Sequence, residues 1–331
     1  MKSEKNVKLI LIFVDGFINN ETSMSLTRAF VFCFSAFSLS FLLFEMLMNK
    51  LEDKSIREPK EEHEFTPLHV LPHSIIIGVK KCGTRALITM LEDIFQDVKI
   101  LVKEPWFFSH YANYERGIEY YKNMLPLMTS PKDIIMEKSP PYFFEPKAAK
   151  RIHEHIPYVK LILIVCDPVR RSMSDFLQEK SIGNISESMT YRNHLTGPDG
   201  YNANTSVVQN SLYGKHIKPW LKIFPWESLL ILDGQELIEN PGEVVKQVEE
   251  YLNLPKTING QTFFKNPRSR FYCWRGRTGQ KCLTDTWKRK GRPHPKTDPQ
   301  VVKWLREYLK PSIEEFYQLT NLDFNWKMDK L

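Results

Sequence analysis

Histidine, cysteine and glycine are scarce in this chain of 331 residues, and their scarcity limits the sites it can build. The nine histidines and five cysteines do not cluster at the spacings of metal ligands, so the sequence predicts a function that needs no metal. None of the 14 glycines opens a GxxxxGK[ST] segment, which disfavours a loop that reads the γ-phosphate of a nucleoside triphosphate. No internal repeat is present.

Acidic residues are outnumbered by basic ones. The chain has 46 Lys and Arg against 39 Asp and Glu, a formal charge of +7 and a pI of about 9.0. This balance favours an anionic partner, but composition alone does not choose among nucleic acid, lipid headgroups and sulfated glycans.

A long uncharged run near the amino terminus predicts a membrane anchor. Residues 29–44 carry no charge, and residues 46–48 extend the run to about the 20 apolar residues that span a bilayer. Basic residues precede it, which favours a cytoplasmic amino terminus and a lumenal remainder. A cleaved signal peptide is the alternative, although its apolar region would lie unusually far from Met1.

The domain boundaries are predicted from this run. Charged residues and prolines follow it, which is typical of a stem without a core of its own. The predicted parts are a cytoplasmic tail at residues 1–28, a transmembrane signal-anchor at 29–48, a stem at 49–72 and a folded domain at 73–331.

The segment from residue 74 to residue 95 changes its pattern halfway. A β-branched run over residues 75–79 predicts a buried parallel strand, and apolar residues at helical spacing follow from Thr84. The turn between them would direct backbone N–H groups and the positive end of the helix dipole to one point, beside Lys81 and Arg85. The segment therefore predicts a phosphate or sulfate site, with an ordinary strand-to-helix turn as the alternative.

Further strands are predicted at residues 98–102, 134–138, 159–165 and 228–232, and two of them run into charged side chains. Glu104 follows the first of these strands and precedes aromatic residues that exclude water, so it is a candidate general base. Lys138 ends the second. A solvated Glu at a loop start and a surface Lys are the alternatives. After residue 165, Asp167 is a candidate N-cap with Pro168 at the first helical position.

Two cysteines and two asparagines in the second half of the chain are relevant to whether this part is lumenal. Cys273 and Cys282 bracket a basic turn, and in a lumenal domain they predict a disulfide hairpin, with two free thiols as the alternative. Asn184 and Asn204 begin N-x-S/T sequons and are predicted to be glycosylated if they are lumenal. They lie in the polar residues 183–210, which we predict to form a long loop.

The turn after the first strand resembles a known motif. Residues 81–85 read KCGTR, similar to the 5′-phosphosulfate loop of sulfotransferases, which bind 3′-phosphoadenosine 5′-phosphosulfate (PAPS). Within those proteins, residues 78–87 most resemble the heparan sulfate glucosamine 3-O-sulfotransferases, and the resemblance extends from about His73 to Trp326. It implies a single P-loop-like α/β domain whose central parallel sheet, flanked by helices, binds PAPS at the carboxyl ends of its strands.

The resemblance also implies a reaction and a location. The reaction is transfer of a sulfonyl group from PAPS to the 3-hydroxyl of glucosamine in heparan sulfate. Glu104 would remove the hydroxyl proton, while Lys81 and Lys138 would balance charge on the leaving phosphate and the sulfonyl oxygens. The expected location is the Golgi membrane, as a single-pass type II protein that acts on an acidic glycan and not on nucleic acid.

Donor and acceptor contacts are carried over from the family in the same way. The donor contacts implied are Lys81, Cys82, Gly83, Thr84, Arg85, Cys166, Ser174 and Tyr272, with Arg289, Lys290, Gly291, Arg292 and His294 in a closing loop. The acceptor contacts implied are Lys103, Glu104, Trp106, Phe107, Phe108, Lys138, Ser139, Pro140 and Pro141.

Four positions depart from the family pattern. Trp106 stands where the family usually has His and Ser109 where it usually has an acid, which predicts altered substrate contacts or proton handling. Cys82 replaces a Gly, and a thiolate there would repel the donor. Cys166 replaces an Arg, which predicts the loss of a charge-assisted contact worth roughly 1.5–3 kcal/mol unless Arg289 supplies the charge.

Three alternative functions share part of these motifs. One is a sulfotransferase acting on another glycan position, and another is a glycan-binding homologue with weakened catalysis. The third is a P-loop kinase, which would depend on magnesium and ATP.

Overall fold

The chain divides into two compact units, Met1–Glu64 and Phe65–Leu331. A computed structural model describes Ser40, residues 43–48 and Lys50 in the first unit, and residues 65–267, 269, 271–283 and 297–326 in the second. The described residues of the first unit are helical and exposed. In these described ranges no helix has the length and apolarity to cross a membrane, and most of the predicted anchor lies outside them.

The second unit is built on a five-stranded parallel sheet. Its strands are β2 (Ser74–Gly78), β3 (Val98–Ile100), β5 (Ile134–Lys138), β6 (Lys160–Val165) and β9 (Leu229–Asp233), in the order β3-β5-β2-β6-β9. Strand β2 lies in the centre, which explains why all five of its residues are buried. The predicted α/β fold with a central parallel sheet is confirmed.

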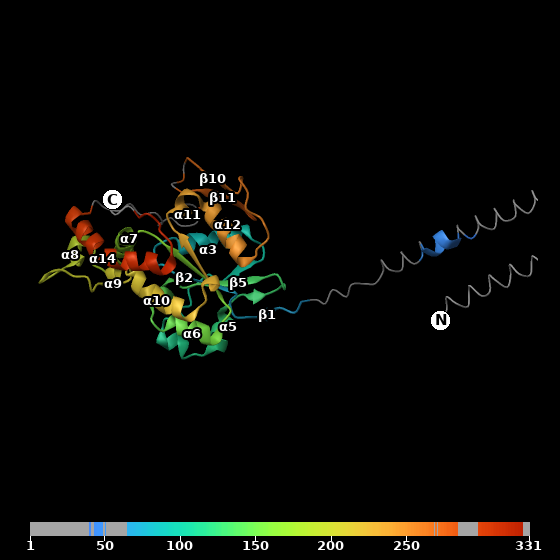
Figure 1. The fold of residues 1–331 in the computed structure, drawn as a ribbon, viewed down its shortest axis with the longest axis horizontal. Helices are drawn as coiled ribbons and strands as arrows, with labels where there is room; N and C mark the ends of the chain where they lie inside the picture. The colour runs from blue at the N-terminus through green and yellow to red at the C-terminus, as the bar shows by residue number, and fades with distance from the viewer. Residues whose placement is uncertain are drawn as a thin grey trace, which may run out of the picture. The chain divides into compact units, whose positions relative to one another are not determined.

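Helices cover both faces of this sheet (Figure 1). On one face lie α3 (Thr84–Ile94), α11 (Glu236–Glu239) and α12 (Pro241–Leu252). On the other lie α6 (Ala148–His155), α7 (Pro168–Ser181), α10 (Tyr213–Ile223) and α14 (Pro299–Thr320).

Strand residues alternate between the two layers of core. Ile76 packs with the layer of α3 and α12, whereas Ile75 and Ile77 pack with the opposite layer. A strand that is apolar at every position is therefore buried on both sides, as the run at residues 75–79 predicted.

The remaining elements are short and surround this framework. They are β1 (Leu68–His69), α4 (Tyr111–Tyr114), α5 (Ile118–Met124), β4 (Leu127–Met128), η1 (Pro140–Phe144), α8 (Tyr191–His194), β7 (Thr196–Gly197), β8 (Gly200–Tyr201), α9 (Ser206–Gln209), η2 (Trp226–Ser228), β10 (Phe263–Phe264), β11 (Cys273–Gly276) and β12 (Gly279–Cys282). Strand β1 pairs with β4, so the segment from Phe65, which the sequence places in the stem, contributes to the folded unit.

The hairpin of β11 and β12 carries the predicted disulfide. Cys273 and Cys282 occupy paired positions and are bonded to each other. Asp93 on α3 contacts this hairpin, accepting hydrogen bonds from Trp274 Nε1 at 2.8 Å and Lys281 Nζ at 2.7 Å.

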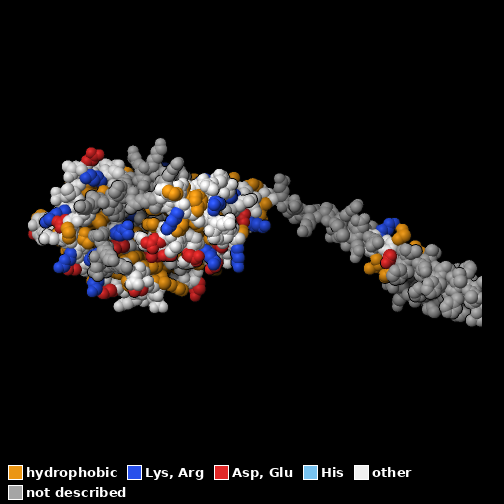
Figure 2. Space-filling model, turned by 90° about the horizontal axis from the view of Figure 1, so that it is seen from above, with side chains coloured by type: hydrophobic (Ala, Val, Ile, Leu, Met, Phe, Trp, Pro, Cys, Tyr) orange, Lys and Arg blue, Asp and Glu red, His pale blue; other side chains and the backbone are white. Residues whose placement is uncertain are grey.

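Lys, Arg, Asp and Glu side chains all appear on the face of this unit seen in Figure 2. The net positive charge of the chain is therefore not gathered into one uniform basic surface on this face.

Candidate active site

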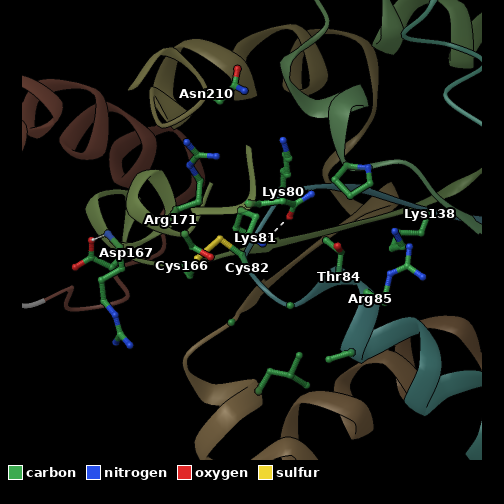
Figure 3. A pocket seen from close by; sticks show the side chains of 18 of the residues that line it. Lys80, Lys81, Cys82, Thr84, Arg85, Lys138, Cys166, Asp167, Arg171 and Asn210 are labelled. Carbon is green, nitrogen blue, oxygen red and sulfur yellow. Dashed lines mark hydrogen bonds between the residues drawn. A yellow bond between two sulfur atoms is a disulfide. The ribbon is translucent and has the colours of Figure 1, made fainter. Parts of the chain in front are cut away.

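A cavity of about 1620 Å³ lies at the carboxyl ends of β2, β5, β6 and β9 (Figure 3). Its lining includes thirteen of the residues that the sequence assigns to the site: Lys81, Cys82, Gly83, Thr84, Arg85, Glu104, Trp106, Lys138, Pro140, Pro141, Cys166, Ser174 and Tyr272. Segments far apart in the sequence thus meet at one edge of the sheet, where ligands of open α/β sheets bind.

Some residues assigned to the site lie elsewhere. Phe107 and Phe108 are buried in the core, where Phe107 stacks on Tyr121 with ring centroids 4.7 Å apart, and neither lines the cavity. Ser139 is also fully buried, and Lys103 is exposed outside the lining. The residues of the expected closing loop, Arg289, Lys290, Gly291, Arg292 and His294, lie outside the described part of the chain.

Two helices begin at the cavity. Gly83 precedes α3 with φ 109°, a left-handed conformation that suits glycine, and an added Cβ would stand 3.1 Å from Leu237 Cδ2. Asp167 caps α7 as predicted, accepting hydrogen bonds from the backbone N–H groups of Val169 at 2.8 Å and Arg170 at 3.1 Å. Both helix N-termini therefore place positive dipole ends beside the lining.

The two lysines of the first turn contact α7. Lys80 Nζ lies 2.8 Å from Asp175 and 2.7 Å from Glu179, and Lys81 Nζ donates to Gln178 Oε1 at 2.6 Å. Burial alone would lower the pKa of Lys80, but the two carboxylates outweigh it and the net pKa is raised. Gln178 and Glu179 were not predicted from the sequence, although both line the cavity together with Ser174 of the same helix.

Glu104 stands on the wall of the cavity with three partners. Its Oε1 accepts a hydrogen bond from Lys138 Nζ and lies 3.7 Å from Arg85 Nη2, while its Oε2 accepts one from Trp106 Nε1 at 2.9 Å. Burial lowers the pKa of Lys138, and the Glu104 carboxylate opposes that shift. A carboxylate, two cations and an exposed indole are therefore grouped on the cavity wall beside α3, which carries Arg85.

A buried carboxyl that the sequence reading missed supports this group. Glu137 precedes Lys138 in β5 and is fully buried, accepting hydrogen bonds from Tyr121 OH at 2.9 Å and Ser139 Oγ at 3.0 Å. Burial raises the pKa of Glu137 to about 7. Ser139 Oγ also accepts the backbone N–H of Trp106 at 3.3 Å, so the chain of hydrogen bonds runs from β5 to the segment of Glu104.

The two cysteines of the cavity are bonded to each other. Cys82 and Cys166 form a disulfide with a Cα–Cα distance of 5.3 Å, visible between the Asp167 and Thr84 sides of the cavity in Figure 3. The expectation of a repelling thiolate at Cys82 is therefore wrong, because neither sulfur carries a proton or a free charge. The loss of a positive charge at residue 166 stays a prediction.

The lining suits a phosphorylated or sulfated ligand. Lys81, Arg85, Lys138 and Arg170 supply cationic donors, and Thr84 supplies a hydroxyl. In the described part of the chain, no group of three or more His, Cys, Asp or Glu side chains could hold a metal ion.

Comparison with known proteins agrees with this geometry. Residues 71–323 match the family profile described as the sulfotransferase domain. Heparan sulfate glucosamine 3-O-sulfotransferase 5 of Mus musculus is 38% identical over 273 residues, covering 81% of this chain and 77% of that protein. Heparan sulfate glucosamine 3-O-sulfotransferase 6 of Homo sapiens is 37% identical over 260 residues, covering 77% and 73%.

The chain belongs to the heparan sulfate glucosamine 3-O-sulfotransferase family. The resemblance drawn from the motifs is confirmed, and the P-loop kinase alternative is wrong. Among solved structures, a sulfotransferase from Alicyclobacillus acidocaldarius superposes with a TM-score of 0.57 at 18% identity, covering 77% of this chain and 98% of that one. At that identity, it supports the sulfotransferase fold alone.

Proposed function

We propose that this sulfotransferase moves a sulfonyl group from PAPS to the 3-hydroxyl of a glucosamine in heparan sulfate. The contact of Glu104 with Lys138, in one cavity with the turn before α3, carries the proposal. This contact brings a carboxylate and an ammonium group together near that turn, which supports a base and a cation next to the donor, as transfer from an anionic donor to an alcohol requires. The two relatives compared above bear the same activity in their names.

Each side chain has one proposed role. Glu104 accepts the proton of the attacking hydroxyl, and Trp106 holds the other carboxylate oxygen in place. Lys138 and Lys81 face the charge that develops on the sulfonyl oxygens and on the leaving phosphate. PAPS supplies the activated sulfonyl group when it is bound.

The donor would be held by groups that already line the cavity. We assign the 5′ end to the turn of Lys81, Thr84 and Arg85 with the N-terminus of α3, and the 3′-phosphate to Ser174 on α7. Tyr272 lies on the same lining and is assigned to the nucleoside. The mechanism uses no metal.

Transfer of labelled sulfate from PAPS to heparan sulfate tests the proposal. Glu104→Gln removes the base, so turnover should fall by about 10²–10⁴-fold while binding of adenosine 3′,5′-bisphosphate is retained. Glu119→Gln is the matched control, because Glu119 is an exposed carboxylate whose partner is Lys122. Equal turnover in the wild type and Glu104→Gln would refute the assignment of the base.

Product analysis separates the remaining alternatives. Disaccharides carrying a new 3-O-sulfate support the proposed acceptor position, whereas sulfate at another hydroxyl would favour a different glycan specificity. A wild-type protein that binds heparan sulfate without transferring sulfate would favour the glycan-binding alternative.

We also propose a Golgi membrane protein, single-pass type II, with the second unit in the lumen. Two disulfides in that unit fit an oxidising compartment. Asn184 and Asn204 are exposed and therefore accessible to glycosylation. A loss of apparent mass on treatment of the expressed protein with an N-glycosidase, abolished in the Asn184→Gln/Asn204→Gln variant, is the expected result.

A further inference from the structure

The Cys82–Cys166 disulfide joins the two segments to which the proposed function assigns the two ends of the donor. Cys82 lies in the turn between β2 and α3, and Cys166 lies between β6 and the N-cap of α7. Strands β2 and β6 are neighbours in the sheet, so the bond fastens the carboxyl ends of adjacent strands, 84 residues apart in sequence. Both cysteines line the cavity.

Two further elements, α10 and the loop after β9, approach this bond closely. The buried Tyr213 of α10 donates its hydroxyl hydrogen to the carbonyl of Cys166 at 3.0 Å, and the same oxygen lies 3.7 Å from Cys82 Sγ. At the end of β9, a Cβ on Gly234 would stand 2.4 Å from the carbonyl oxygen of Cys82, so the close approach of this third loop requires glycine. Tyr213 and the loop at Gly234 therefore pack closely against the two cysteines beside the cavity.

The bond also links two departures from the family pattern, the Cys in place of Gly at residue 82 and the Cys in place of Arg at residue 166. It removes the thiolate that would repel an anion at residue 82, although it does not replace the charge of an Arg at residue 166. Bonded together, the two cysteines form a neutral crosslink that holds the two segments at a fixed spacing. Fixing a binding site in its bound geometry reduces the entropy lost when the ligand binds.

We propose that the Cys82–Cys166 disulfide is a positioning element for the sulfonyl donor, setting the spacing of the 5′ and 3′ phosphate segments before the donor binds. The inference rests on the proposed function, because it concerns a nucleotide that carries phosphate at both ends. Lys81, Ser174 and the two helix N-termini contact the donor, and the disulfide acts through them.

Calorimetry with adenosine 3′,5′-bisphosphate and the full-length protein tests this role. Cys82→Ala, Cys166→Ala and the double variant all break the same bond, so each should raise the Kd by roughly tenfold and their effects should not add. The loss should appear more in the Kd and in the KM for PAPS than in the turnover rate at saturating PAPS, because saturation compensates for weaker donor binding. Ser188→Ala is the control, because Ser188 is exposed and lies outside the cavity lining, and its Kd should stay within about twofold of the wild type.

A second measurement avoids the risk that the alanine variants fail to fold. The fraction of Cys82–Cys166 that is reduced at equilibrium with a dithiol buffer is measured by alkylation of the released thiols, with and without saturating adenosine 3′,5′-bisphosphate. Because the effect of the bond on nucleotide binding equals the effect of the nucleotide on the bond, a tenfold change in Kd implies that the ligand should lower the equilibrium constant for reduction of this bond about tenfold, and that of Cys273–Cys282 less.

The outcomes separate the two proposals. If the wild type binds adenosine 3′,5′-bisphosphate but the folded double variant has the same Kd, or the ligand leaves the equilibrium constant for reduction unchanged, the positioning role is refuted and the proposed function stands. If the wild type does not bind the nucleotide at all, the proposed function loses its donor, and this inference is refuted with it.

Discussion

Glu104 holds its two carboxylate oxygens in different environments. Oε1 faces the cations Lys138 and Arg85, whereas Oε2 is held by the indole N–H of Trp106. Trp106 is 47% exposed on the cavity wall, so its ring is also accessible to an acceptor. The departure from histidine at this position therefore still leaves a hydrogen-bond donor on the proposed base.

Trp106→Phe tests that role while keeping an aromatic ring. The variant loses one hydrogen bond to a charged oxygen, worth about 1.5–3 kcal/mol, so turnover should fall by roughly 10- to 100-fold. Steady-state sulfate transfer at saturating PAPS and heparan sulfate measures the change. Trp226→Phe is the control, because Trp226 is similarly exposed at 46% and lies outside the cavity lining. An unchanged turnover in Trp106→Phe would show that this hydrogen bond does not contribute.

Glu137 predicts a pH dependence of stability. Its folded-state pKa is raised by burial to about 7, from 4.5 in the unfolded chain. Between pH 4.5 and pH 7, Glu137 keeps a proton in the folded protein that it has lost in the unfolded chain. The stabilisation of the folded state by this protonated side chain is therefore fully present below pH 4.5 and is lost as the pH rises through 7. The wild type should therefore lose about 3 kcal/mol of unfolding free energy relative to Glu137→Gln between pH 4.5 and pH 8.

Urea unfolding at pH 4.5 and pH 8 measures this difference. Subtracting the Glu137→Gln value at each pH cancels the other titrating groups that the two proteins share. Glu119→Gln should follow the wild type at both pH values, because Glu119 is an exposed carboxylate. If the unfolding free energy of the wild type rises relative to that of Glu137→Gln with increasing pH, the raised pKa of Glu137 is contradicted.

At the scale of elements, the β11–β12 hairpin depends on one carboxylate of α3. Asp93 is 5% exposed and accepts hydrogen bonds from Trp274, Lys281 and Thr278 of the hairpin. Asp93→Ala leaves the buried indole N–H of Trp274 without its partner, which should cost about 1–3 kcal/mol of unfolding free energy. Urea unfolding measures the loss, and Asp199→Ala, at an exposed turn between β7 and β8, should change it by less than about 0.5 kcal/mol.

The central strands of the sheet could be predicted because a strand that is buried on both faces has a nearly continuous run of apolar residues. The apolar runs at residues 75–79 and 159–165 became β2 and β6, and the cap at Asp167 lies where its residue type predicted. Residues 183–210 were wrongly predicted to be one long loop. They form α8, β7, β8 and α9, which are too short for periodicity to show and depend on tertiary contacts, such as Tyr201 stacked on Trp304 at 4.8 Å.

The candidate active site could be predicted only in part, because some of its contacts depend on how distant segments are brought together. The turn of residues 81–85 and Glu104 carry local signals, since charged side chains follow apolar strands. The Cys82–Cys166 bond carries no local signal, because it depends on the order of strands in the sheet, which places β6 beside β2. The link from Glu137 through Ser139 to the segment of Glu104 likewise appears only when β5 and that segment are brought together.

At the scale of the whole second unit, the two disulfides restrain very different lengths of chain. Cys82 and Cys166 are 84 residues apart and join the loops that follow two strands of the central sheet, whereas Cys273 and Cys282 are 9 apart within one hairpin. Crosslinking a longer loop removes more conformational entropy from the unfolded chain. The long crosslink should therefore contribute more to global stability than the hairpin crosslink.

Pairwise replacement compares the two contributions. The chain-entropy relation gives about 4–5 kcal/mol for the long loop and about 2–3 kcal/mol for the short one. Cys82→Ala/Cys166→Ala should accordingly lower the unfolding free energy by about twice as much as Cys273→Ala/Cys282→Ala, measured by urea unfolding without reductant. Equal losses would mean that native contacts around each bond, rather than the length of the closed loop, determine the contribution. A larger loss for the hairpin pair would contradict the entropic argument, because the hairpin closes the shorter loop.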